Sequence, residues 1–192
     1  MDVKRLVILG ALFVLLVILV IVFFIRGGGE KAIQSQVSPP PEMYHPSEKP
    51  QEKKKIILFF LSEDDTLLHP EEREIYASPS IVYEAKQVIE ELIRGSQNDF
   101  LSPLPPQTRL RELYLPENGV AYVDFSKDFQ GTHSSGSSAE ISTVYSIVNS
   151  LTYNFRSIKK VFILVEGGEK ETLGGHINLN IAFLPQYSLI AK

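Results

Sequence analysis

The sequence predicts an α+β fold, a two-layer domain with one mixed β-sheet and two packed helices, preceded by a transmembrane helix. Three observations lead to this prediction. An unbroken apolar block lies near the N-terminus, two helical patterns of apolar residues follow, and short strand-like apolar runs flank them. Residues 53–192 are enough for one domain with a substantial core and too few for two.

The apolar block runs from Leu6 to Ile25 and predicts an uncleaved membrane anchor. At about 1.5 Å of rise per residue, a helix of this length spans roughly 30 Å of hydrocarbon. The block leads directly into Arg26 and a run of glycines, without the small-residue cleavage site of a signal peptide. Lys4 and Arg5 favour a cytoplasmic N-terminus for residues 1–5, which puts the rest of the chain on the periplasmic or outer face of the cell membrane.

Residues 26–52 have the composition of a linker. Glycines open the segment, and prolines follow among Gln, Ser, Lys and Glu. Such a segment cannot build a core and acts as a tether. We therefore expect residues 53–192 to form the single globular domain.

The sequence of the first half of the domain predicts two strands and a helix. Residues 53–62 form a continuous apolar run after a basic lead-in, as in a strand buried on both faces, and residues 73–77 suggest a short second strand. Ser78, Pro79 and Ser80 then resemble a helix start. Apolar residues at helical spacing predict a helix over 81–94, which Gly95 ends.

A proline-bearing loop, 96–108, leads into two further strands at 109–115 and 120–125. The segment that joins them contains Asn118 and Gly119. This residue pair tolerates the positive φ values of a type I′ turn, so the sequence predicts a β-hairpin.

The second helix follows a loop, 127–138, that is rich in Gly and Ser. Ser137 and Glu140 have the spacing of a capping box, which assigns Glu140 a structural role at the helix start. Apolar residues at helical spacing continue to Phe155, and 161–165 predicts another buried strand.

Glycine pairs punctuate the C-terminal part of the domain. Gly167 belongs to a turn, and Gly174 and Gly175 precede His176 and a last extended stretch, 177–183. Neither pair has the strand-to-helix context of a phosphate-binding loop, so we interpret them as structural.

No grouping of residues predicts catalysis, a cofactor or a metal site. The chain has no cysteine, and His69, His133 and His176 are too far apart in sequence for a helical ligand pair. His133 lies among serines, but there is no G-x-S-x-G motif. We therefore expect no enzyme, and we assign His176 a structural role. The net charge of −4 argues against nucleic acid as a partner.

Six landmarks between residues 55 and 185 occur in a characteristic order: IILFF, EAKQVIEELIRG, LPPQTRLREL, GVAYVDFS, SSAEISTVYSIVNSLT and VFILVEGGEKETLGGHI. In this order they resemble the GerMN domain of the sporulation and spore germination protein family. The resemblance implies an envelope-exposed domain, similar to ring-building modules of secretion-type and sporulation channels, that acts through protein contacts. Some members of the family are lipoproteins, and the namesake sporulation protein carries two GerMN domains in tandem. This chain resembles a single GerMN domain, and it has a predicted membrane anchor and no cysteine that could be lipidated.

The sequence thus favours a non-catalytic, membrane-anchored extracytoplasmic interaction domain that assembles or positions an envelope protein complex. Its partners would be envelope proteins or a second copy of itself, contacted through sheet edges and polar helix faces at Glu84, Glu91, Ser142 and Asn149. Two alternatives stay open. One is a module that binds cell-wall glycan or another small ligand between the 96–108 and 127–138 loops, and the other is a hydrolase that uses His133 or His176.

Overall fold

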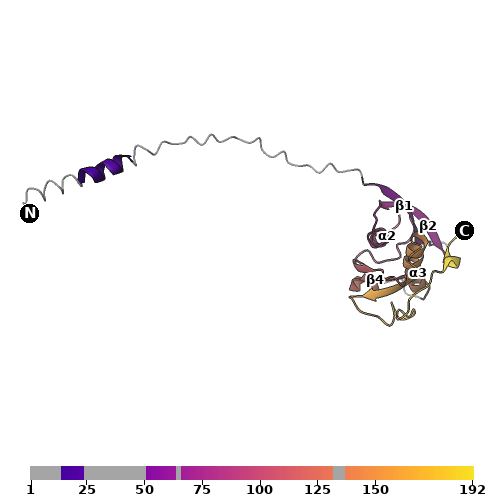
Figure 1. The fold of residues 1–192 in the computed structure, drawn as a ribbon. Coiled ribbons are helices and arrows are strands. Elements are labelled where there is room, and N and C mark those ends of the chain that lie inside the picture. The colour runs from indigo at the N-terminus through magenta and orange to yellow at the C-terminus, as the bar shows by residue number, and fades with distance from the viewer. Residues whose placement is uncertain (1–13, 24–50, 64–65, 132–136) are drawn as a thin grey trace, which may run out of the picture. The chain divides into compact units, whose positions relative to one another are not determined.

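The chain divides into two compact units, Met1–Ser47 and Glu48–Lys192. A computed structural model describes residues 14–23, 51–63, 66–131 and 137–192 (Figure 1). In the first unit, residues 14–23 form an exposed helix. The remainder of the anchor predicted over 6–25, the terminus 1–5 and nearly all of the linker 26–52 lie outside the described residues. Among the helices that are described, none is long and apolar enough to cross a membrane.

The second unit contains two β-sheets. The first is an antiparallel hairpin, and the second has the order β3-β4-β5, with an antiparallel and then a parallel pair. In chain order the elements are β1 (Lys53–Leu61), β2 (Leu68–Tyr76), α2 (Ile81–Arg94), β3 (Leu110–Tyr114), β4 (Val120–Phe125), η1 (Lys127–Gln130), α3 (Ser137–Asn154), β5 (Lys160–Val165) and η2 (Tyr187–Leu189).

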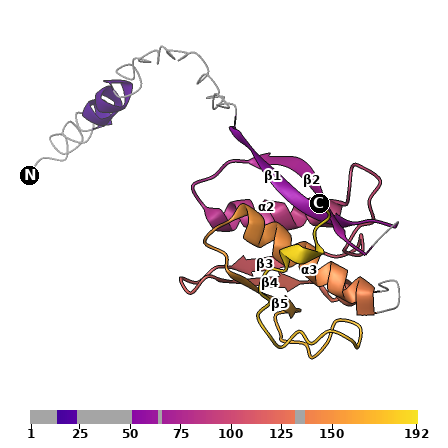
Figure 2. The same ribbon diagram turned by 90° about the vertical axis from the view of Figure 1, so that its right-hand side faces the viewer.

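The α+β class and a mixed sheet are confirmed, but the two-layer arrangement with a single sheet is wrong. Helices α2 and α3 lie between the β1-β2 hairpin and the β3-β4-β5 sheet, which gives three layers (Figure 2). Apolar side chains from both sheets and both helices share one core; they include Ile56, Val88, Val123, Ile147 and Ile163.

The two sheets stay separate because helix α3 occupies the free edge of β1. The N–H of Ile57 donates to Oδ1 of Asn154 at 3.0 Å, and the N–H of Phe59 donates to Oγ of Ser150 at 3.1 Å. The Ser146 hydroxyl donates to the Phe59 carbonyl, and Nδ2 of Asn154 donates to the Ile57 carbonyl. These three side chains are four residues apart on α3, so they form one stripe that hydrogen-bonds to β1 as a neighbouring strand would.

Helix α3 therefore lacks the exposed polar face that the sequence suggests. Ser142 and Asn149 are buried. The amide of Asn149 holds the backbone of Gln186, since its Oδ1 accepts from Gln186 N at 2.9 Å and its Nδ2 donates to Gln186 O at 3.1 Å. Polar residues on this helix thus fasten β1 on one side and the C-terminal segment on another.

Helix α2 begins and ends as predicted. The Ser80 side chain accepts from the Tyr83 N–H, and Gly95, with φ of +90°, follows the last turn. Glu84, however, is buried instead of solvent-facing. It forms an ion pair with Lys54 at 2.7 Å and accepts from the Ser78 N–H at 3.0 Å. Glu91 is also partly covered, and its carboxylate contacts Arg73 and Arg94.

The β3-β4 hairpin is confirmed, but its turn is not type I′. Only Gly119 has a positive φ, of +76°, while Asn118 does not. The Asn118 side chain instead accepts from the Val120 N–H at 3.0 Å, and the Gly119 N–H donates to the Pro116 carbonyl at 3.2 Å. Asn118 therefore acts through its side chain and Gly119 through its backbone freedom.

Candidate functional site

The most connected of the predicted site residues is Glu140, in the first turn of α3. Its carboxylate lies against the loop at 174–177, far away in the sequence. Oε2 accepts from the N–H groups of His176 at 3.2 Å and Ile177 at 3.0 Å, and Oε1 lies 2.7 Å from Nδ1 of His176. The structure thus brings Glu140, Gly174 and His176 together.

The capping box was the wrong interpretation of Glu140, because the hydrogen bonds to its carboxylate come from the 174–177 loop. The side chain is 3% exposed. Burial acts to raise the pKa of Glu140, but hydrogen bonds from the His176 ring and from the backbone of Ile177, Gly174 and His176 outweigh it and lower the pKa to about 2. A buried carboxylate with this set of donors stays ionised and holds the loop in place.

Gly174 leaves room for this contact. A Cβ atom at Gly174 would lie 2.8 Å from Oε1 of Glu140, which is closer than side chains can approach. Gly175 has a φ of +110°, a conformation that favours glycine. The two glycines thus have different structural roles, close approach and backbone conformation.

Gly167 belongs to a different site, the corner after β5. Its N–H donates to Oδ1 of Asp124 at 2.8 Å, and its φ is +74°. Arg111 approaches the same carboxylate, with 3.5 Å between Nη1 and Oδ2 of Asp124. This corner ties β5 to β4 and has no contact described with the Glu140 cluster.

Sequence reasoning missed a buried charge cluster at the C-terminal end of α2. Arg73 is 5% exposed and donates to Glu71, to Glu91 at 3.1 Å and to the carbonyl of Gly95 at 2.7 Å. Burial acts to raise the pKa of Glu71, but hydrogen bonds from Ser96, Gln97 and Arg73 lower it overall. Glu71 and Arg73 are two residues apart on a strand, so their side chains share a face, and this spacing of opposite charges could have predicted the ion pair.

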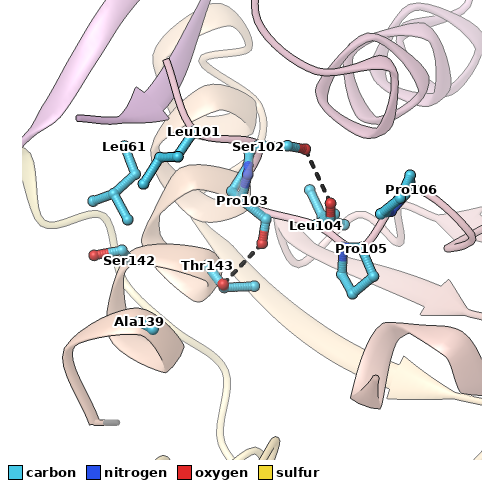
Figure 3. Close-up of a pocket in the computed structure, with 10 residues that line it drawn as sticks. All are labelled: Leu61, Leu101, Ser102, Pro103, Leu104, Pro105, Pro106, Ala139, Ser142 and Thr143. Atoms are coloured by element: carbon cyan, nitrogen blue, oxygen red, sulfur yellow. Dashed lines mark hydrogen bonds between the residues drawn. The ribbon is translucent and has the colours of Figure 1, made fainter. Parts of the chain in front are cut away.

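A groove lies between the proline-bearing loop and the start of α3 (Figure 3). It measures about 250 Å³, and residues 101–106, Leu61 and the α3 residues Ala139, Ser142 and Thr143 line it. The hydroxyls of Ser102 and Thr143 donate within the protein, to the carbonyls of Leu104 at 2.9 Å and Pro103 at 2.8 Å. The predicted 96–108 loop therefore forms one wall of the groove. The start of α3 forms the other wall, and the described part of the predicted 127–138 loop before α3, residues 127–131, does not line the groove. Residues 132–136 lie outside the described residues.

The two histidines of the domain that the structure describes, His69 and His176, contact different parts of the protein. His69 stacks on Phe100, whereas His176 contacts Glu140. His133 lies outside the described residues. Within the described segments, no group of three His, Cys, Asp or Glu side chains could hold a metal ion.

The outer face of the β3-β4-β5 sheet carries a row of aromatic side chains. Tyr114 pairs with Tyr122, and Tyr122 pairs with Phe162, so the three lie side by side across the strands. Their neighbours in sequence, such as Val123 and Ile163, point into the core, which places the row on the face away from α2 and α3. The Tyr122 and Phe162 rings are 5.5 Å apart, and Tyr114 is 56% exposed.

This architecture, a hairpin and a mixed sheet on either side of two helices, is that of a GerMN domain. A structure of the first GerMN domain of the sporulation protein GerM from Bacillus subtilis matches with 22% identity and a TM-score of 0.53, over 69% of this chain and 98% of that one. The tandem GerMN domains of the same protein match with 24% identity and a TM-score of 0.56, over 68% of this chain and 46% of that one.

The chain belongs to the Germane family, described as sporulation and spore germination proteins, because the model of this family matches residues 57–171. A further similar structure is that of a Clostridium perfringens protein proposed to be a lipoprotein, with 24% identity and a TM-score of 0.50, over 72% of this chain and 93% of that one. Among curated proteins, none matches.

Proposed function

We propose that this chain is a membrane-anchored, extracytoplasmic interaction domain that positions an envelope protein complex. The aromatic row of Tyr114, Tyr122 and Phe162 is the observation that carries the proposal, because it lies on the sheet face away from the two helices, with Tyr114 exposed and Tyr122 and Phe162 partly exposed. Membership of a sporulation and germination family supports it, as does the fold shared with a protein proposed to be a lipoprotein. The apolar segment 6–25 would provide the anchor.

The chemistry of the row suits a protein partner. Aromatic side chains supply large contact areas with little loss of conformational freedom, and they are enriched where interfaces concentrate binding energy. Lys160 on β5 is exposed beside the row, and Glu112 on β3 lies beside it with its carboxylate ion-paired to Lys86 of α2. Charges at the rim of an apolar patch favour one docking orientation and one partner over others.

A glycan-binding role has less support from the groove in Figure 3. Ligand pockets usually measure about 300–1,000 Å³ and present polar groups that converge on the ligand. The groove is smaller, at about 250 Å³, and two of its hydroxyls donate to backbone carbonyls of its own loop. We therefore place the functional surface on the sheet.

The proposal can be tested with the full-length protein in its native membrane. After mild solubilisation, the wild-type protein should migrate in a larger complex, and Tyr114→Ala should dissociate it. Tyr153→Ala is the matched control, because Tyr153 on α3 is also 56% exposed and lies outside the row. A complex that survives Tyr114→Ala and the double variant with Phe162→Ala would contradict the proposal.

A further inference from the structure

The outward edge of β2 contains a segment whose backbone groups have no hydrogen-bond partner among the described residues. Because β1 and β2 pair in antiparallel register, alternate residues of β2 point their backbone groups away from β1. Ile57 and Phe59 direct their backbone groups at α3, so their register partners Glu72 and Pro70, and with them the other even-numbered residues of β2, direct theirs away from β1. On the free edge of β1, the outward backbone groups of Ile57 and Phe59 already bond to α3, and the Leu61 carbonyl accepts from the Leu101 N–H. Only the short Lys53–Lys55 end of that edge has no described partner, so the longer outward row of β2 is the better place for another strand.

Both ends of this outward row are occupied. At one end, the N–H of Ala191 donates to the Leu68 carbonyl at 3.0 Å, so the C-terminal tail runs beside the start of β2. At the other end, the side chain of Gln87 bonds both the N–H and the carbonyl of Tyr76, each at 2.9 Å. The gap between the two ends covers Pro70, Glu72 and Glu74.

The gap has room for an added strand. Two hollows of about 410 Å³ each adjoin it, and both are bordered by Glu74 on β2 and by Glu91 and Arg94 on α2. Pro70 faces outward and has no N–H to offer, while Glu72 and Glu74 present both N–H and C=O groups. An extended segment could therefore bond to the strand without displacing any described contact.

The charges at the gap indicate what kind of segment would fit. On the β1 side, Glu72 is paired with Lys55 at 2.7 Å and Glu74 with Lys53 at 3.1 Å. Glu72 and Glu74 lie on the exposed face of β2, and the residues of an added strand opposite them would share that face, where lysine or arginine at alternate positions would continue the pattern. A second copy pairing through its own β2 would set Glu72 and Glu74 against the same glutamates, and like charges directly opposite each other are destabilising.

We propose that the edge of β2 between Pro70 and Glu74 takes an extended segment of another protein as an added strand, and that this segment carries basic side chains at alternate positions. The backbone groups of Glu72 and Glu74 would supply affinity, and their carboxylates would supply selectivity. This surface is separate from the aromatic row, so either proposal can fail without the other.

The test uses the full-length protein in detergent micelles and a short synthetic peptide in which lysine alternates with valine. NMR-detected hydrogen exchange follows the N–H groups of Glu72 and Glu74. With the peptide at about ten times its dissociation constant, exchange at both should slow roughly tenfold. The same peptide with glutamate in place of lysine should give no protection.

Two variants separate backbone pairing from charge. Glu72→Pro removes an outward N–H, as Pro70 already does, so the hairpin should persist while protection of the Glu74 N–H is lost. The double variant Glu72→Lys, Glu74→Lys should favour the glutamate peptide. Glu169→Lys, Glu171→Lys is its control, with the same change in charge at exposed positions elsewhere.

Three results would overturn the proposal. The first is an absence of protection at Glu72 and Glu74 in the wild-type protein. The second is equal protection by the lysine and glutamate peptides, or protection that Glu72→Pro leaves intact. The third is protection that grows with protein concentration alone, which would show that a second copy occupies the edge.

Discussion

Nδ1 of His176 lies 2.7 Å from Oε1 of Glu140, although the two residues are 36 positions apart in the sequence. The same carboxylate accepts from the N–H groups of His176 and Ile177, so one buried charge fixes the loop that follows Leu173. This loop packs over the start of α3 and leads to Phe183, which bridges to Val161 on β5. Glu140 therefore couples the helix to the chain that completes the edge of the mixed sheet.

Glu140→Gln should lower the free energy of unfolding by about 2–3 kcal/mol, because it replaces a charged acceptor with an amide that must satisfy the same donors. Urea denaturation measures this. His176→Ala should cost less, since its ring is half exposed and the backbone bonds to Glu140 persist. Glu90→Gln, at an exposed position on α2, is the control. Equal stability of Glu140→Gln and Glu90→Gln would refute the role of the carboxylate.

Acid should destabilise the protein through the same group. The pKa of Glu140 is about 2 in the folded protein and about 4.5 in the unfolded chain. Its stabilising contribution is therefore fully present above pH 4.5 and is lost as the pH falls toward 2, to a total on the order of 3 kcal/mol. Stability measured against pH should fall less steeply over this range in Glu140→Gln. An unchanged slope would exclude Glu140 as the titrating group.

Gly174→Ala should destabilise the protein by about 1–3 kcal/mol, because the new Cβ meets the Glu140 carboxylate. The effect should depend on that side chain. In a double-mutant cycle with Glu140→Ala, the cost of Gly174→Ala should largely disappear, since the shorter side chain leaves space. Additive costs would instead indicate that the backbone of residue 174 is the cause.

Ser150→Ala should cost about 1–3 kcal/mol, because it leaves the buried N–H of Phe59 without an acceptor. Ser138→Ala is the control on the same helix, where the side chain is exposed. Thermal unfolding of both variants measures the difference. If the two variants unfold at the same temperature, α3 does not stabilise the β1 edge through this bond.

The ranges of the helices and strands could be predicted from the sequence better than the contacts between them. Helix α2 matched its predicted range because its apolar face, serine cap and terminal glycine are all local signals. The second strand begins earlier than predicted, at Leu68, because Pro70 faces outward and interrupts no bond to β1. The single sheet was wrong because a serine or asparagine looks the same in sequence whether it bonds water or a strand. Ser146, Ser150 and Asn154 were thus indistinguishable from a solvated stripe.

The candidate site shows the same division. Glu140, Gly174 and His176 were singled out individually, but the capping-box spacing gave Glu140 a local partner in place of the loop at 174–177. The aromatic row needed the strand register, because Tyr114, Tyr122 and Phe162 come from three strands and align only when the sheet forms.

Site-specific photo-crosslinking from the aromatic row tests the proposed function most directly. A benzophenone amino acid replaces Tyr114 in the full-length protein in its native cells, and the same probe replaces Tyr153 as the equally exposed control. We predict a discrete protein adduct from position 114 that is absent from position 153 and that Phe162→Ala weakens. No adduct from position 114, or the same adducts from both positions, would contradict the claim that this sheet face is an interaction surface.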